Sequence, residues 1–276
     1  MAKRDEIMRA SLELMMRVHE HAEIPLWGEM APPHHREGAV FPTVRAYLAK
    51  GAKYAVVILP GGGYFQLSVG SEGVAVAKAL NERGVSAFVV TYRYAPCDRC
   101  AILSDGRRAM QFVRFYAEDF GIDPERVALM GFSAGGHLAM CVAEHPEGAC
   151  VDEISKIDAH PNACILAYPV TTLEDGTFPT MPPIFLGEEN MMLAPMYSYG
   201  YRISSMPPTF IWYSQKDTAV NYVKNSDALY AALIKAGKPC ECHAFSDGGH
   251  GVGLGLDFPE CAAWLDLAIT FLNENL

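Results

Sequence analysis

Short apolar runs alternate with longer amphipathic segments along most of the chain, and this alternation restricts the possible folds more than any other feature. Runs typical of strands, most of them apolar throughout as in strands buried on both faces, occupy 54–59, 85–92, 126–130, 163–168, 209–213 and 240–245. Apolar residues at helical spacing, often followed by Gly or Pro, predict helices at 71–83, 105–120, 133–145, 221–236 and 261–273. Strands that alternate with helices predict an α/β fold with a mostly parallel central sheet and helices on both faces.

The regions outside this alternation complete the predicted domain organisation. With 276 residues, half of them hydrophobic, the chain suits a single domain over 1–276. Apolar spacing over 4–20 predicts a helix, so that about 1–22 would form an N-terminal helical extension. The Pro-rich and His-rich segment 22–42 is interpreted as a loop, and 44–48 alternates as a half-buried strand does.

The segment of about 171–208 breaks the alternation and is longer than a normal connection. We interpret it as a small lid-like insertion, because such insertions often carry binding surfaces. Its long side chains could line an acyl or sugar pocket, pack the insertion onto the sheet or form a subunit contact. These side chains are Met191, Met192, Met196, Tyr197, Tyr199 and Tyr201.

Charge and hydropathy exclude several classes of partner. The formal net charge is −10, and no basic run is present to contact phosphates, which argues against nucleic acid. No apolar run approaches the ~20 residues of a membrane span, and the first residues lack the apolar block of a signal peptide. We therefore expect a cytoplasmic protein that binds neither nucleic acid nor membrane.

Eight cysteines are expected to stay reduced in that compartment. Cys97 and Cys100 form a Cys-x-x-Cys pair, but a zinc site needs a second ligand pair, and Cys240 with Cys242 does not have the usual spacing. We expect neither a metal nor a cofactor.

A Gly-Phe-Ser-Ala-Gly segment at 131–135 matches Gly-x-Ser-x-Gly and has Ser133 at its centre. It lies directly after a predicted strand and directly before a predicted helix, which is the context of a nucleophile elbow. The serine of such an elbow needs a strained backbone at a sharp turn, and small neighbours let adjacent chain approach. The sequence therefore predicts Ser133 as a nucleophile rather than as a passive serine in a Gly-rich turn.

His250 is the best candidate for the base that activates Ser133. It follows the last predicted strand, so its loop would lie at the carboxyl edge of the sheet, over the nucleophile. His137 lies on the helix that follows Ser133 and is interpreted as a packing or hydrogen-bonding residue, while His243 falls inside a strand. The alternative is that His250 is a turn residue among glycines.

Asp217 is the favoured partner of this base, because a carboxylate fixes the histidine tautomer and stabilises the imidazolium. It follows the strand at 209–213, and the order Ser133, Asp217, His250 is that of α/β-hydrolases. Asp247 is the alternative, although three residues from His250 it is better placed to shape the turn.

Acyl transfer also needs donors for a developing oxyanion. Three glycines, Gly61 to Gly63, follow the strand at 54–59, where the first oxyanion loop is expected. We predict the backbone N–H groups of Gly62, Gly63 and Ala134 as these donors.

Several segments together resemble the bacterial esterase and lipase group of α/β-hydrolases that includes acetyl-xylan-esterase-like enzymes and relatives of hormone-sensitive lipase. The segments are Pro60-Gly-Gly-Gly-Tyr64, Tyr92-Arg93-Tyr94, Asp105-Gly-Arg-Arg-Ala109, Gly121-Ile-Asp-Pro-Glu-Arg126, Gly131-Phe-Ser-Ala-Gly-Gly-His-Leu-Ala139, Pro207-Pro-Thr-Phe210 and Gly248-Gly-His-Gly251. The resemblance covers about 24–276 and implies the α/β-hydrolase fold, no cofactor and a triad of Ser133, Asp217 and His250. One departure is Pro60, where the hormone-sensitive-lipase pattern has His.

The predicted function is hydrolysis of short acyl esters, with acetylated sugars or xylo-oligosaccharides suggested by the resemblance. Amide hydrolysis, as in an arylformamidase or small peptidase, is the enzymatic alternative, because the same triad serves both reactions. A catalytically inactive binding protein is a third interpretation, disfavoured by candidates at every triad position. A homodimer is plausible because the insertion and the N-terminal helix offer apolar surface.

Overall fold

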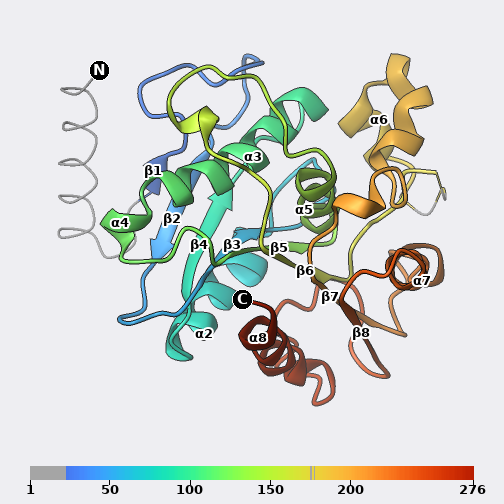
Figure 1. Ribbon diagram of the computed structural model, residues 1–276. Coiled ribbons are helices and arrows are strands. Elements are labelled where there is room, and N and C mark those ends of the chain that lie inside the picture. The colour runs from blue at the N-terminus through green and yellow to red at the C-terminus, as the bar shows by residue number, and fades with distance from the viewer. Residues whose placement is uncertain (1–22, 175, 177) are drawn as a thin grey trace.

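An eight-stranded sheet forms the centre of the computed structural model, which describes residues 23–174, 176 and 178–276 (Figure 1). Its order is β1-β2-β4-β3-β5-β6-β7-β8. The pairs β1–β2 and β2–β4 are antiparallel, and every other neighbouring pair is parallel. The strands are β1 (Glu23–Pro25), β2 (Thr43–Tyr47), β3 (Ala55–Leu59), β4 (Ser86–Thr91), β5 (Val127–Phe132), β6 (Ala163–Ala167), β7 (Thr209–Ser214) and β8 (Cys240–Phe245).

Helices cover both faces of this sheet, as Figure 1 shows. One face packs against α2 (Ala75–Glu82) and α8 (Trp264–Asn275), and the other against α3 (Arg99–Phe115), α5 (Ala134–Glu144) and α7 (Ala228–Lys235). The remaining helices are α4 (Ala117–Phe120) and α6 (Met181–Leu186). Short helical segments of other geometry are η1 (Val69–Val74), η2 (Ile154–Lys156), η3 (Glu188–Tyr197), η4 (Ile203–Ser205), η5 (Val223–Asp227) and η6 (Cys261–Ala263). The predicted α/β architecture is confirmed.

The apolar runs are continuous because each central strand contributes side chains to two hydrophobic cores, one on each face of the sheet. In β3, Ala55, Val57 and Leu59 join the core under α3 and α5, whereas Val56 and Ile58 join the core under α2 and α8. All five side chains are fully buried. Successive residues of a strand point to opposite faces, so a strand covered on both sides has no position for a polar side chain.

Two predicted boundaries are wrong. The segment 22–42, which we interpreted as a loop, contains β1, a strand of three residues that pairs with β2. A strand this short shows no periodic apolar pattern in the sequence. The helix predicted from 105 begins at Arg99, where the side chain of Asp98 accepts a hydrogen bond from the Cys100 amide and caps the helix. The predicted N-terminal helix at 4–20 lies outside the described residues.

Asp105 therefore lies within α3, where it forms a fully buried ion pair with Arg93. The Arg93 guanidinium donates to both carboxylate oxygens, each over 2.7 Å, and the Trp27 indole N–H donates to Oδ1 over 2.8 Å. Arg108, on the same helix, pairs with Asp152 and stacks its guanidinium on Trp27. This cluster joins α3 to the end of β4 and to the loop after β1.

The segment 171–208 contains α6, η3 and η4 and lies to the right of α5 in Figure 1, toward the upper right of the view. Tyr197 packs on the rings of Phe185 and His145, and Tyr199 packs against the buried core. Met192 is 81 % exposed and Tyr201 is 50 % exposed. Of the three roles predicted for these side chains, packing onto the rest of the domain therefore applies to Tyr197 and Tyr199. The lid-like character of the segment stays a prediction.

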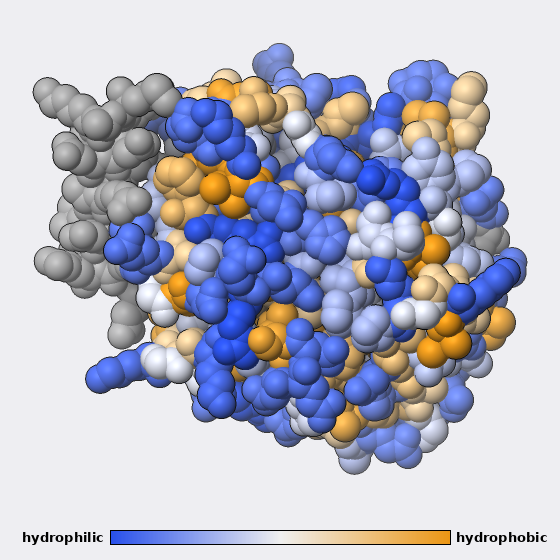
Figure 2. All heavy atoms as spheres, viewed as in Figure 1, coloured by the Kyte–Doolittle hydropathy of each residue, from blue (hydrophilic) through white to orange (hydrophobic). Residues whose placement is uncertain are grey.

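On the face seen in Figure 2, hydrophobic residues form separate groups among hydrophilic ones. The predicted homodimer stays a prediction. Within the described part of the chain, none of the helices combines the length and the apolar character needed to cross a bilayer. The cytoplasmic location likewise stays a prediction.

Candidate active site

Ser133 is the single residue that connects β5, which ends at Phe132, to α5, which begins at Ala134. Its backbone has φ +52° and ψ −117°, a conformation that costs energy for any residue with a side chain. The surrounding chain holds it there, because the Ser133 N–H donates to Ala167 O and the Ser133 carbonyl accepts from Val170 N. The predicted strained turn at Ser133 is present in the structure.

The glycines of the motif are sterically required. A Cβ at Gly131 would lie 2.1 Å from the carbonyl oxygen of Gly135, and a Cβ at Gly135 would lie 2.1 Å from the carbonyl oxygen of Leu59. Both obstacles are backbone atoms that cannot rotate away. The sharp turn thus forces β5, α5 and β3 so close together that only glycine fits at these two positions.

The structure brings Ser133, His250 and Asp217 together from three different connections. His250 Nε2 lies 2.8 Å from Ser133 Oγ, and His250 Nδ1 lies 2.7 Å from Asp217 Oδ2. Asp217 follows β7 and His250 follows β8, so both loops leave the same edge of the sheet as the turn at Ser133. The Asp217 side chain is 1 % exposed and that of His250 is 20 % exposed, which leaves the imidazole accessible from one side.

The second oxygen of Asp217 fixes the carboxylate to its own loop. Oδ1 accepts hydrogen bonds from the amides of Ala219 and Val220, each over 2.9 Å. Asp247, the alternative acid, instead accepts hydrogen bonds from the amides of Glu260 and Cys261 and closes the turn after β8. Asp217, and not Asp247, therefore contacts His250.

The predicted oxyanion loop follows β3 directly. Gly62 has φ +133° and Gly63 has φ +63°, values that L side chains rarely adopt, and a Cβ at Gly62 would lie 2.1 Å from the carbonyl oxygen of Gln66. Within the described residues, neither the Gly62 nor the Gly63 amide donates a hydrogen bond. Ala134 is the first residue of α5, where backbone N–H groups lack intrahelical acceptors and the helix dipole favours negative charge.

The rival histidines have other roles. His137 is fully buried, with Nδ1 2.8 Å from the Tyr64 hydroxyl and Nε2 2.7 Å from the carbonyl oxygen of Tyr197. Burial lowers the pKa of His137 to about 4, so its imidazole is neutral at physiological pH. His243 lies on β8, and its ring stacks on that of Phe210 on the neighbouring strand β7.

Sequence reasoning missed four residues around this site. Glu72 and Tyr168 are buried next to the loops of Gly61 and His250. Phe65 and Phe178 flank the oxyanion loop, since a Cβ at Gly63 would meet Phe65 Cε1 at 2.5 Å and Phe178 Cε1 at 3.3 Å. Of these four residues, only Tyr168 could have been found from the sequence, because it directly follows β6 at the same edge of the sheet as Ser133.

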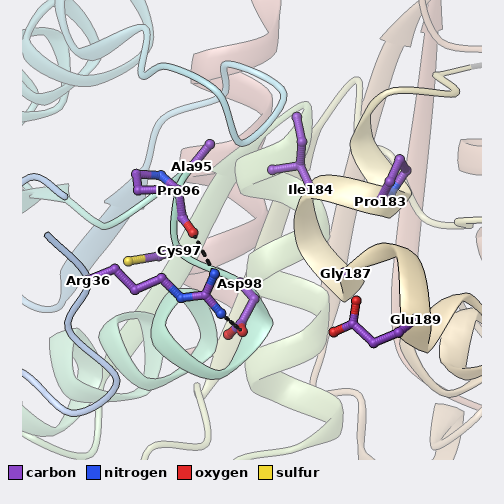
Figure 3. A pocket seen from close by; sticks show the side chains of 9 residues that line it. All are labelled: Arg36, Ala95, Pro96, Cys97, Asp98, Pro183, Ile184, Gly187 and Glu189. Carbon is purple, nitrogen blue, oxygen red and sulfur yellow. Dashed lines mark hydrogen bonds and ion pairs between the residues drawn. The ribbon is translucent and has the colours of Figure 1, made fainter. Parts of the chain in front are cut away.

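A separate pocket of about 230 Å³ lies between the connection that follows β4 and the segment of α6. One of its lining residues, Ala95, donates its amide N–H over 2.9 Å to the carbonyl oxygen of Tyr64, the residue after the oxyanion loop. Figure 3 shows the Arg36 guanidinium held between Pro96 O and Asp98 on one side, with α6 and the start of η3 opposite. Its lining residues are Arg36, Ala95, Pro96, Cys97, Asp98, Pro183, Ile184, Gly187 and Glu189.

Cys97 lines this pocket but is itself buried, whereas Cys100 is exposed in the first turn of α3. Both thiols are free. Among residues 23–174, 176 and 178–276, no group of three or more His, Cys, Asp or Glu side chains is arranged to hold a metal ion.

Comparison with known families gives a match over residues 56–254 to a family described by its alpha/beta hydrolase fold. An acetylxylan esterase from Xylanibacter ruminicola is 34 % identical over 210 residues, which are 74 % of this chain and 42 % of that protein. A protein named endo-1,4-beta-xylanase B from Butyrivibrio fibrisolvens is 29 % identical over 246 residues, 84 % of this chain and 38 % of that protein. This chain thus spans less than half the length of these two relatives.

Solved structures are similar over nearly their whole length. An acetyl ester-xyloside bifunctional hydrolase from Caldicellulosiruptor lactoaceticus superposes with a TM-score of 0.85 at 32 % identity, covering 92 % of this chain and 96 % of that one. A propionate-bound esterase from Thermogutta terrifontis superposes with a TM-score of 0.70 at 26 % identity, covering 85 % and 90 % of the two chains.

Proposed function

The chain belongs to the alpha/beta hydrolase fold family, and we propose that within it the protein is a serine carboxylic-ester hydrolase acting on short acyl esters. The observation that carries this proposal is the hydrogen-bonded chain from Ser133 Oγ through His250 to Asp217. A serine next to a histidine that a buried carboxylate orients is the arrangement that activates a hydroxyl for attack on an acyl carbon.

The acylation step would use these groups in order. Ser133 Oγ attacks the ester carbonyl carbon while His250 Nε2 takes its proton, and Asp217 stabilises the imidazolium through Nδ1–H. The carbonyl oxygen becomes an oxyanion that accepts hydrogen bonds from the amides of Gly62, Gly63 and Ala134. The imidazolium then gives its proton to the departing alcohol oxygen, which leaves an acyl group on Ser133.

Deacylation repeats the sequence with water in place of the hydroxyl. His250 removes a proton from a water molecule, whose oxygen attacks the acyl carbon, and the same amides hold the second oxyanion. The bond to Ser133 Oγ then breaks and Oγ recovers a proton from the imidazolium. The products are a carboxylic acid and the free enzyme.

For the alcohol part of the substrate, we propose acetylated sugars or xylo-oligosaccharides. The support is that relatives named acetylxylan esterase and acetyl ester-xyloside hydrolase are 34 % and 32 % identical to this chain. The half-exposed ring of Phe65 and the partly buried ring of Phe178 beside Gly63 offer apolar surface next to the proposed oxyanion site.

Ser133→Ala tests the nucleophile. We expect loss of nitrophenyl acetate hydrolysis and loss of labelling by a fluorophosphonate probe, because the attacking oxygen is gone. Ser226→Ala, which changes a buried serine in η5, is the matched control and should keep both. Full activity in Ser133→Ala would refute the proposed mechanism.

A substrate panel tests the bond and the acyl group. It contains nitrophenyl esters from acetyl to octanoyl, acetylated xylo-oligosaccharides, and anilides of the same acids. We expect kcat/KM to be highest for acetyl esters and to be lowest for the anilides. Faster cleavage of the anilides would favour the amidase alternative.

A further inference from the structure

Glu72 is a buried carboxylic acid beside the proposed site, and the mechanism above does not use it. It lies in η1 and is 3 % exposed. Burial raises the pKa of its carboxyl, and hydrogen bonds to the carboxylate partly offset that effect. A buried carboxyl is costly unless each oxygen finds a donor, so its partners show what the residue is fixed to.

The first partner is the oxyanion loop. Gly61 N–H donates to Glu72 Oε2 over 2.7 Å, and Gly61 immediately precedes the two amides proposed to hold the oxyanion. The fit is close, because a Cβ at Gly61 would lie 2.7 Å from Glu72 Oε2 and 3.0 Å from Ser133 Cβ. Gly61 is thus bonded to the Glu72 carboxylate and packed closely against the proposed nucleophile.

The second partner leads to the loop of the base. The Tyr168 hydroxyl donates to Glu72 Oε1 over 2.8 Å and accepts from the amide of Gly253 over 3.1 Å. Gly253 lies in the loop of His250, and the Tyr168 ring packs edge-on against the imidazole with 5.0 Å between ring centroids. Tyr168 has φ +35°, which is uncommon for a residue with a bulky side chain and is maintained by its surroundings.

We propose that Glu72 is a positioning residue which, together with Tyr168, holds the oxyanion loop and the His250 loop in fixed relation to Ser133. The inference rests on the proposed function, since the two loops matter for rate only if Ser133 is acylated. Each carboxylate oxygen accepts one of these two hydrogen bonds, whereas a glutamine would place a donating N–H₂ group at one of the two positions. Preorganised amides are effective only when they are held at the place where the oxyanion forms.

Three variants separate the parts of this arrangement. Glu72→Gln keeps the shape and one acceptor oxygen, Glu72→Ala removes both acceptors, and Tyr168→Phe keeps the ring on His250 but loses the hydroxyl. Two matched controls make the same changes elsewhere. Glu144→Gln alters a buried carboxyl near the end of α5, and Tyr213→Phe removes a hydroxyl that donates to Asp227 over 2.5 Å.

The readouts are kcat and KM for nitrophenyl acetate per fluorophosphonate-labelled site, the labelling rate itself, and thermal unfolding. We expect Glu72→Gln and Tyr168→Phe to lose about 10-fold to 100-fold in kcat and in labelling rate, because a small misplacement of reacting groups has that effect. KM should stay within about threefold, since only transition-state contacts are affected. Glu72→Ala should lose more than Glu72→Gln, and both controls should match the wild type in kcat, KM and labelling rate.

Other outcomes would overturn the inference. If the variants are merely less stable, kcat per labelled site and the labelling rate of the folded fraction stay at the wild-type values. Labelling needs no knowledge of the natural substrate, so it tests positioning separately from ester hydrolysis. A wild type that labels but cleaves no ester refutes the proposed function alone, and one that does neither refutes both.

Discussion

Asp217 binds His250 with one carboxylate oxygen and its own loop with the other. Oδ2 lies 2.7 Å from His250 Nδ1, and Oδ1 accepts two backbone amides over 2.9 Å each. The carboxylate therefore cannot turn without breaking two further hydrogen bonds. This arrangement specifies which nitrogen of His250 carries the proton, because Nδ1 must donate to Asp217 and Nε2 is left to accept from Ser133.

Asp217→Asn should leave the protein folded and strongly impair hydrolysis. An asparagine can present its N–H₂ group to His250, which would favour the wrong tautomer, and kcat should fall by about 10⁴-fold as in other triads. Steady-state kinetics on nitrophenyl acetate measure the effect. Asp247→Asn is the matched control and should retain activity, because the Asp247 carboxylate accepts backbone amides of the turn and it is Asp217 that bonds to His250. An equal loss in Asp247→Asn would contradict the assignment of the acid.

Gly135→Ala should prevent the sharp turn at Ser133 from forming correctly. Its Cβ would lie 2.1 Å from the backbone oxygen of Leu59, so β3 or α5 would have to shift. We expect a loss of about 3 kcal/mol in the free energy of unfolding, at the upper end for overpacking of a core. Denaturant unfolding followed by circular dichroism measures it. Gly70→Ala, where a Cβ meets nothing within 4 Å, should be nearly neutral, and equal losses in the two variants would refute the steric explanation.

The local sequence around Ser133 contains most of what determines its turn, which explains why the turn could be predicted. The carboxyl ends of parallel strands meet at one edge, so residues after β7 and β8 could also be predicted to approach Ser133. The contacts of Glu72 could not, because one acidic residue in a helical segment carries no sign of burial. Its burial depends on Gly61 and Tyr168, which lie in other connections of the sheet.

The ends of elements were harder to predict where distant partners determine them. β1 exists through pairing with β2. The start of α3 depends on Asp98, which both caps the helix and pairs with Arg36 from the early loop. Apolar periodicity identifies the buried part of a helix and gives no information on a polar first turn such as that of α3.

Asp105→Ala should destabilise the fold more than any exposed ion-pair variant. The Arg93 guanidinium would stay buried without its carboxylate, and removing one partner of a buried pair costs about 3–5 kcal/mol. Asp266→Ala is the matched control, because the Asp266 side chain is 69 % exposed in its pair with Arg83 and such pairs contribute about 0.2–1 kcal/mol. Urea unfolding of both variants makes the comparison. Similar losses of unfolding free energy in the two variants would show that the buried Arg93–Asp105 pair stabilises the fold no more than an exposed pair does.

Glu144 should make the stability of the protein depend on pH. Its side chain is fully buried near the end of α5, and burial raises the pKa of its carboxyl from 4.5 to about 7. The amides of Arg202 and Gly200 and the charge of Arg202 only partly offset that effect. The folded state therefore holds a proton that the unfolded state releases near pH 4.5, so the contribution of Glu144 to stability falls as pH rises from about 4.5 to 7.

Glu144→Gln cannot ionise and should not show this fall. Relative to the wild type, the variant should gain little at pH 4.5 and up to about 3 kcal/mol above pH 7, from the difference between the two pKa values. Urea unfolding of both proteins between pH 4.5 and 8 measures the difference. Glu147→Gln, at an exposed neighbour whose pKa the Arg202 hydrogen bond lowers to about 2, is the control and should not produce a gain that grows with pH. A constant difference between Glu144→Gln and wild type would mean that Glu144 does not titrate in this range.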